Sequence, residues 1–348
     1  MSYTDIDDSS VHFQTTLYTG NGGTLAVTND GNSDLQPDWV WTKKRSDTSH
    51  HALVDSSRGA TKQIYTNLTA AEETVSGVTA FNTDGFTLGS NGTANLNGAT
   101  FVAWQWKANG GTTASNTTGS VTSTVQVNSD AGFSIVTFDS ASSGNFSVGH
   151  GLGVQPAMII TKNREGTGQW YTWHQHLTGG TSNTSYLLSL NRTDAEESFA
   201  NAWGAGVTSS VFGMQSGNTA TASNDYIAYC FAEKQGYSKF GKYVGNGSTN
   251  GTIIYTGFKP AFVLWRIISS SGDWRMVDTK RGVNGAIPRI KPNASSAEGS
   301  AGDNVDLLSN GFKFRSTAAS ANASGASYIY MAFAEHPFVA GGVPTTAR

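Results

Sequence analysis

Residues 36–45 (QPDWVWTKKR) begin a pattern that recurs twice more along the chain, as QPAMIITKNR at 155–164 and KPAFVLWRII at 259–268. The proline near the start of each stretch lacks an amide donor, which suits the first residue of a strand. The apolar residues behind it run on without the polar alternation of a half-exposed strand. The three stretches therefore predict short β-strands that are buried on both faces.

Each of these strands is followed by further segments that match in order among the three copies. The first copy continues with HHALVDSSRG at 50–59, NLTAAE at 67–72, DGFTLG at 84–89 and ATFVAWQWK at 99–107. The third continues with WRMVDTKRG at 274–282, NASSAEG at 293–299, NGFKFRS at 310–316 and ASYIYMAFAE at 326–335. The second copy, at 170–234, is more diverged. A unit of about a hundred residues can bury its own core, so the repeats predict tandem domains.

We expect the units to be separated by connecting segments of different composition. The predicted organisation is an N-terminal anchoring segment at 1–17, repeat 1 at 18–108, a polar Gly-rich linker at 109–124, repeat 2 at 125–236, repeat 3 at 237–338 and a C-terminal arm at 339–348.

The closing segment of each copy predicts the fold class most directly. Along Phe101 to Lys107, Val102, Trp104 and Trp106 alternate with residues on the opposite face, as side chains do along a strand. Several short strands per unit, with 41 glycines in the chain to form tight turns, indicate an all-β protein. We predict three tandem β-sandwich units of jelly-roll or lectin-like type, with short helical turns at 69–73 and 193–197.

The charge of the chain and its N-terminal sequence exclude some partners and a secretory route. Charged residues make up 14% of the chain and the net charge is −3, so neither nucleic acid nor an anionic membrane surface is expected as a partner. No apolar stretch approaches the ~20 residues that span a bilayer, so membrane insertion is not expected either. No charged-then-apolar leader opens the sequence, which predicts synthesis in the cytoplasm without a signal peptide. The single cysteine, Cys230, lies in an apolar run and is interpreted as a small buried hydrophobic residue.

An Asp-x-x-Arg-Gly element is the most distinctive polar signature. Asp55 with Arg58 and Asp278 with Arg281 occupy matched places in copies 1 and 3, close enough for a charge-assisted hydrogen bond across a turn. We interpret each pair as a structural clasp. Copy 2 has no such pair.

A cluster of aromatic and histidine residues offers weak candidates for binding. Exposed rings stack on the apolar faces of sugars, although core packing is the competing interpretation of the same cluster. The candidates are Trp170, Tyr171, Trp173, His174 and His176. No Cys or Asp cluster completes a ligand set around the histidines, so we predict neither a metal site nor a cofactor, and no catalytic constellation points to an enzyme.

The ordered set of motifs resembles a family of tailed-bacteriophage proteins. The resemblance covers about 18–338 and includes QPDWVW, DxxRG, DGFTLGS, FVAWQWK and YIYMAFAEHPF. It implies a virion structural protein, located in the virion and contacting other virion proteins. We expect a tail-associated fibre or adhesin component that touches a host surface glycan, as a homo-oligomer and preferably a trimer. The alternatives are a capsid head decoration protein and, less favoured, a tailspike polysaccharide hydrolase.

Overall fold

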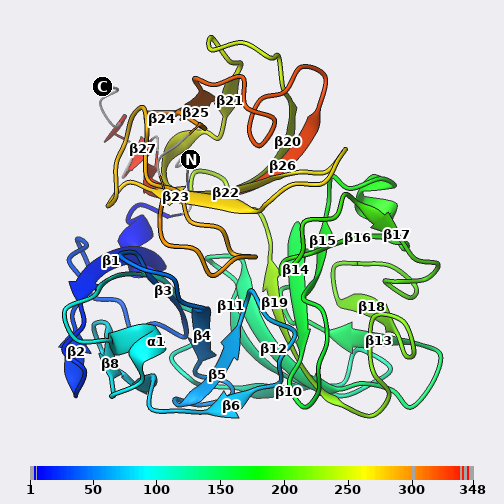
Figure 1. Cartoon of the computed structure of the whole chain (residues 1–348). Helices are drawn as coiled ribbons and strands as arrows, with labels where there is room; N and C mark the ends of the chain where they lie inside the picture. Colours follow the sequence, from blue (N-terminus) through cyan, green and yellow to red (C-terminus); the bar gives the residue numbers. More distant parts are fainter. Residues whose placement is uncertain (1–3, 5, 300–301, 338, 341–342, 345–348) are drawn as a thin grey trace.

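The chain folds into three β-sandwich units arranged around a common centre (Figure 1). The structure is a computed structural model that describes residues 4, 6–299, 302–337, 339–340 and 343–344. Within these residues it is nearly all β, with several antiparallel sheets. We refer to the strands β1–β9 as unit 1, β10–β19 as unit 2 and β20–β26 as unit 3.

Unit 1 has a six-stranded main sheet in the order β1-β9-β3-β4-β5-β6 and a small sheet in the order β2-β8-β7. Its elements are the 3₁₀ turn η1 (Ser9–Val11), β1 (Phe13–Thr19), β2 (Leu25–Val27), β3 (Trp39–Lys44), β4 (His51–Asp55), β5 (Lys62–Tyr65), β6 (Glu73–Thr74), β7 (Val78–Phe81), β8 (Phe86–Leu88), the helical turn α1 (Gly92–Asn95) and β9 (Thr100–Trp106).

Unit 2 has an eight-stranded main sheet in the order β10-β11-β12-β19-β14-β15-β16-β17 and a small sheet of β13 and β18. Its elements are β10 (Ala114–Asn116), β11 (Ser123–Asn128), β12 (Phe133–Asp139), β13 (Asn145–Gly149), β14 (Met158–Asn163), β15 (Tyr171–His174), the 3₁₀ turn η2 (Gly180–Ser182), β16 (Tyr186–Ser189), β17 (Glu197–Ser198), β18 (Val211–Gln215) and β19 (Asp225–Phe231).

Unit 3 has a four-stranded main sheet in the order β20-β26-β22-β23 and a small sheet in the order β21-β25-β24. Its elements are β20 (Ser238–Val244), β21 (Ile253–Tyr255), β22 (Phe258–Ile267), β23 (Arg275–Asp278), β24 (Val305–Leu308), β25 (Gly311–Phe314) and β26 (Ser327–Pro337), after which β27 (Val339–Ala340) pairs with β28 (Val343–Pro344).

The same four strands form the centre of every main sheet. The orders β1-β9-β3-β4, β12-β19-β14-β15 and β20-β26-β22-β23 match strand for strand. The strands predicted from the prolines, β3, β14 and β22, pair with the closing strands β9, β19 and β26. The prediction of burial on both faces is confirmed, because every residue of β3 and β14 is buried. In the run 261–265 of β22, only Ala261 is partly exposed.

Each main sheet packs against a core on both of its faces. One face covers the small sheet of its own unit, and these three cores are separate. The other face points to the centre, where side chains of all three units form one cluster that includes Trp39, Trp106, Phe231, Phe262 and Phe333. The Trp39 ring stacks on Tyr229 of unit 2 at 4.6 Å. The repeats are therefore not independent domains on a string, since they share their largest core.

Several expected segments differ from the structure. Residues 1–17, expected as an anchoring segment, contribute η1 and most of β1, because Phe13 extends the main sheet beside Trp106. Asp8 caps η1, and the Ser9 hydroxyl donates to the carbonyl of Glu335 in unit 3. The expected linker at 109–124 contains β10, which pairs with β11. The arm expected at 339–348 lies partly outside the described residues.

The short helices were predicted at the wrong place. Residues 69–73 and 193–197 contain no helix, and Glu73 and Glu197 begin the strands β6 and β17. The amide of Glu72 donates to the carbonyl of Arg164 in unit 2, so the neighbouring unit satisfies this backbone instead of a helical turn. The helical turn α1 lies at Gly92–Asn95, where the side chain of Asn91 caps it.

Replacing Trp39 by alanine should destabilise all three units together. The side chain is fully buried in the shared core, so the free energy of unfolding in urea should fall by about 3–5 kcal/mol. Hydrogen exchange should then accelerate in β19 and β26 as well as in β3. Leu17→Ala, an exposed position on the same sheet, should change stability by less than about 0.5 kcal/mol. Faster exchange confined to unit 1 would contradict a shared core.

Candidate functional site

The polar groups that the sequence singles out lie where one unit meets the next. We call β3, β14 and β22 the proline strands. In each unit the next strand of the sheet, β4, β15 or β23, ends opposite the same position of the proline strand. The residue at that end is Asp55, His174 or Asp278. These positions face a strand of a different unit. We call the three contact regions joints 1/2, 2/3 and 3/1 after the units that they connect.

Joint 1/2 contains the first predicted clasp. Arg58 Nε donates to Asp55 Oδ2 at 2.5 Å, and both side chains are completely buried. The Tyr229 hydroxyl of unit 2 donates to the same Asp55 oxygen at 2.7 Å. Burial by itself lowers the pKa of the Arg58 guanidinium, but the adjacent Asp55 carboxylate raises that pKa well above its ordinary value. The clasp is thus a charged pair that a second unit completes.

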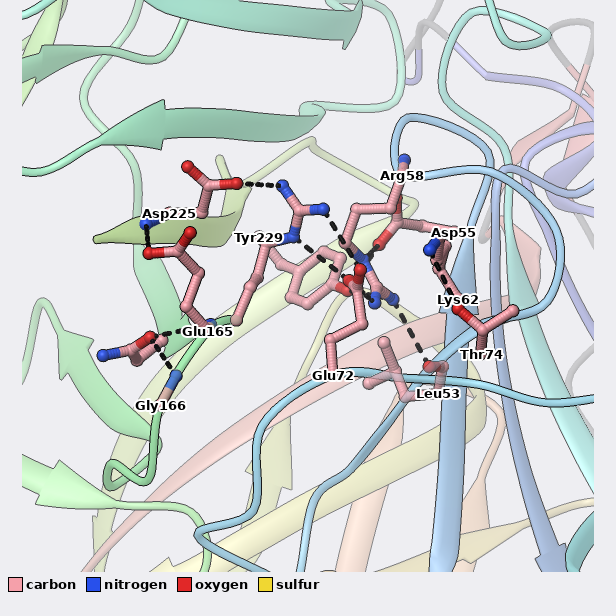
Figure 2. A network of polar contacts seen from close by, with 12 residues as sticks. Leu53, Asp55, Arg58, Lys62, Glu72, Thr74, Glu165, Gly166, Asp225 and Tyr229 are labelled. Atoms are coloured by element: carbon pink, nitrogen blue, oxygen red, sulfur yellow. Dashed lines mark hydrogen bonds and ion pairs between the residues drawn. The ribbon is translucent and has the colours of Figure 1, made fainter. Parts of the chain in front are cut away.

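Joint 1/2 continues through Glu72, which connects two arginines (Figure 2). Arg58 Nη1 donates to Glu72 Oε2 at 2.8 Å, and Arg164 of unit 2 donates to both carboxylate oxygens at 3.1 and 3.2 Å. Burial raises the pKa of Glu72, but the hydrogen bonds from Arg164 and the charge of Arg58 outweigh it and leave the pKa below its ordinary value. Glu72 is therefore held ionised between the units.

Joint 3/1 has the same plan with different donors. Arg281 Nε donates to Asp278 Oδ2 at 2.7 Å, and both side chains are fully buried. The group that reaches in from unit 1 is the indole of Trp104, whose Nε1 donates to Asp278 Oδ2 at 2.9 Å. Arg45 of unit 1 binds Glu298 with two parallel hydrogen bonds of 2.9 Å.

Joint 2/3 keeps the geometry without the ion pair. His174 takes the aspartate position, and Leu177, which takes the arginine position, is buried in the shared core. The His174 Nε2 atom lies 3.3 Å from the carbonyl of Tyr330 in unit 3, and Nδ1 accepts from the amide of His176. Burial, assisted by the neighbouring His176, lowers the pKa of His174 to about 3, so the ring is neutral.

A buried cation spans every joint. Lys43, Lys162 and Arg266 occupy the same position of the proline strand, and each is fully buried. Each donates to backbone carbonyls of the loop that precedes a matched glutamate in the neighbouring unit. These contacts are Lys162 to Thr69 at 2.9 Å, Lys43 to Ser295 at 3.4 Å, and Arg266 to Ser189 at 2.9 Å and to Arg192 at 2.7 Å.

The three joints form a closed ring. The buried cations follow one order around it: Lys162 of unit 2 donates to unit 1, Arg266 of unit 3 donates to unit 2, and Lys43 of unit 1 donates to unit 3. The backbone connects the same pairs of units in the opposite donor direction, since the amides of Glu72, Glu196 and Glu298 donate to the carbonyls of Arg164, Ile268 and Arg45. A head-to-tail contact that repeats with a rotation closing on itself generates a ring. The chain thus contains a pseudo-threefold ring within one polypeptide.

The predicted binding cluster separates into buried and accessible parts. Trp170 is buried in the shared core, where its Nε1 donates to the carbonyls of Tyr65 and Leu68 at joint 1/2. Trp173 is buried in the core of unit 2 and His174 is buried at joint 2/3. His176 is exposed, and Tyr171 is partly exposed at a surface cleft.

That cleft lies in unit 2 beside joint 1/2 and has a volume of about 630 Å³. The loops at 142–144, 167–169 and 216–222 form its walls, together with Tyr171, Tyr226 and Thr69 of unit 1. It is the strongest candidate for a ligand site, because it is a concave surface that combines aromatic rings with hydroxyl and amide groups. Among the described residues, no group of three or more His, Cys, Asp or Glu side chains could hold a metal ion.

The sequence reasoning missed the partners that connect the units. It placed Glu72 in a helical turn, whereas Glu72 and its counterpart Glu298 each bind an arginine of the neighbouring unit. Arg45 and Arg164 end the repeated QP segments at matched positions, and this recurrence was the available signal. Tyr229 and Trp104 also recur at one position of the closing strand, but only the packing of units shows that each approaches another unit's aspartate.

Comparison with protein families gives one match that spans this whole ring. The model of a domain of unknown function (DUF7483) matches residues 8–337. The chain belongs to this family. The DUF7483 match runs from the cap of η1 to the end of β26, so it contains all three units and all three joints. No curated protein and no solved structure matches the chain. No helix in the described residues is long and apolar enough to cross a membrane.

Removing one clasp arginine should be far more damaging than removing an exposed one. Arg58→Leu leaves Asp55 buried without its ionic partner and should lower the free energy of unfolding by about 3–5 kcal/mol. Arg315→Leu removes a 2.6 Å pair with Asp306 whose arginine side chain is 44% exposed, and should cost less than about 1 kcal/mol. Urea denaturation at pH 7 measures both. Equal losses would contradict the importance of the joint.

Acid should weaken joint 2/3 before the carboxylates titrate. The pKa of His174 is about 3 in the folded chain and about 6.5 when unfolded, so unfolding takes up a proton between these values. His174 therefore stabilises the fold above pH 6.5, and this contribution falls by about 1.4 kcal/mol per pH unit below it. His174→Gln should flatten the measured dependence of stability on pH between 6 and 4. His176→Gln, at an exposed site, should flatten it less.

Proposed function

We propose that this chain is a structural protein of tailed-bacteriophage virions, acting in the tail as a component that contacts the host surface. The sequence motifs that resemble phage proteins are the first support. The single structural observation that carries the proposal is the closed ring, in which three sandwich units bury their mutual contacts in one chain. Such a body suits a rigid part that transmits contact between a particle and a surface.

The ring also bears on the expected oligomeric state. A homotrimer was expected because repeated weak contacts gain strength from multivalency. One chain already holds three units around a pseudo-threefold centre. A single copy can therefore dock onto a threefold-symmetric protein of the virion. We propose that avidity comes from several copies on one particle.

The runner-up, a decoration protein of the head, would need terminal segments that are free to lie on the capsid. The N-terminal part is engaged within its own chain, since Asp8 caps η1 and also accepts from the Ser33 hydroxyl at 2.8 Å. Ile6 is buried in the shared core. This favours the tail proposal over the head proposal.

Gold-labelled antibody against the purified chain should mark the tails of intact virions of the phage that carries the gene. A tail location follows from a role in contact with the host surface, and pre-immune serum is the control. Labelling confined to heads would replace the adhesin by the decoration protein. If intact virions carry no label, and the antibody also fails to react with denatured virion protein, the virion proposal is overturned.

A further inference from the structure

We propose that the cleft of unit 2 binds a neutral carbohydrate, in a site that units 1 and 3 have closed. This inference deepens the proposed function, because it assigns the contact with the host surface to one place in the ring. The repeat supplies its own comparison, since the same loops occur in three versions. The three versions differ in how these loops are held together.

In unit 1 an asparagine seals the place that corresponds to the cleft. Asn95 Nδ2 donates to the Asn21 side chain at 3.1 Å and to the carbonyls of Gly23 and Gly89 at 2.6 and 2.7 Å. These bonds tie the loop before the closing strand to the glycine-rich hairpin. The hydroxyl of Tyr18 adds a further bond to the carbonyl of Ala94 at 2.8 Å.

Unit 3 repeats this seal almost bond for bond. Asn322 Nδ2 donates to the Asn246 side chain at 2.9 Å and to the carbonyls of Ser248 and Ser316 at 2.8 and 3.0 Å. The hydroxyl of Tyr243 donates to the carbonyl of Ala321 at 2.8 Å. Both units thus fill the junction with buried side-chain amides.

Unit 2 has lost both parts of the seal. Phe138 takes the strand position of Tyr18 and Tyr243 and has no hydroxyl, as the paired registers show. The loop at 216–224 is shorter than its counterparts at 89–99 and 315–326, and the side chains of its asparagines, Asn218 and Asn224, bond to residues outside the hairpin at 140–144. Ser140 links the two loops instead, since its hydroxyl donates to the carbonyl of Thr221 at 2.5 Å and accepts from the amide of Asn224 at 3.1 Å. The cleft of about 630 Å³ opens beside this link, where residues 142–144 and 216–222 line it.

The surface of the cleft fits a neutral polyol. None of the residues that line it is charged. In the described part of the chain, the hydroxyls of Ser142, Ser143 and Thr167 have no hydrogen-bond partner, so they are available to a ligand. The partly exposed ring of Tyr171 provides an apolar surface on which a sugar ring can stack. A charged sugar would find no counter-ion on these walls.

The backbone leaves room for a ligand to approach closely. Gly144 and Gly217 have φ values of 70° and 84°, a left-handed conformation that favours glycine. A side chain built at either position would meet nothing within 4 Å, so both glycines face open space in the cleft. Because the side chains of Asn95 and Asn322 fill the corresponding place in units 1 and 3, we expect one carbohydrate site per chain.

Saturation-transfer NMR with the full chain tests this site. The probes are methyl glycosides of glucose, galactose, mannose, rhamnose and N-acetylglucosamine, with sialic acid and glucuronate as charged comparisons. At least one neutral glycoside should show transfer, and the charged sugars none. Transfer to charged sugars alone, or to no sugar, would overturn the proposal.

Thr167→Trp should fill the cleft and weaken binding of the best neutral sugar at least tenfold. Its matched control is Ser271→Trp, because Ser271 is the exposed residue at the same position of the unit 3 loop. Tyr171→Ala should also weaken binding, with circular dichroism to confirm the fold. Equal affinity for the Thr167 variant and the wild type would place the sugar elsewhere and overturn the site.

The virion and carbohydrate proposals can fail separately. Gold label on tails with no neutral sugar bound would leave the virion role and remove the cleft. Neutral sugar bound at the cleft, with virions free of the protein, would leave the cleft and remove the virion role.

Discussion

The burial of three main sheets against one another is the constraint on which the rest of the structure depends. A sandwich normally covers one face of its main sheet with a second sheet and leaves the other to water. Here the second face is as apolar as the first, with Trp39, Trp104 and Trp106 directed away from their own small sheet. No unit can satisfy that face alone. The other two units cover this face, and three such faces meet at one centre.

Packing apolar faces at a centre requires that the polar groups at their margins find partners across the joints. The buried charges Asp55, Arg58 and Lys162 would each be costly if the neighbouring unit were absent. Oriented donors such as the Tyr229 hydroxyl set the rotation of one unit against the next. The apolar core thus drives association, and the polar joints specify one arrangement. Joint 2/3 reaches the same arrangement with a neutral His174, which shows that the ring does not require an ion pair at every position.

The sequence predicted the units and their central strands, but not how they associate. The QP segments and the closing strands repeat strongly, so the strand positions, the doubly buried faces and the two clasps could be inferred from local pattern. The position of Glu72 could not, because an acid after alanines also fits a helix cap until the approach of Arg164 is known. The binding cluster divided for the same reason. Trp170 and Trp173 lie close in sequence to Tyr171, yet alternation along β15 and the turn before it direct them into cores.

The sequence of unit 2 has diverged from those of units 1 and 3, and this divergence explains why the cleft lies in unit 2. Units 1 and 3 keep the asparagine seal, and unit 2, which lacks it, opens a cleft at its margin with unit 1.

The shared core and the three joints require the three units to unfold as one cooperative body. Differential scanning calorimetry of the intact chain tests this most directly. We predict one transition whose calorimetric enthalpy equals its van't Hoff enthalpy. Three resolved transitions, each with about a third of the total enthalpy, would contradict it.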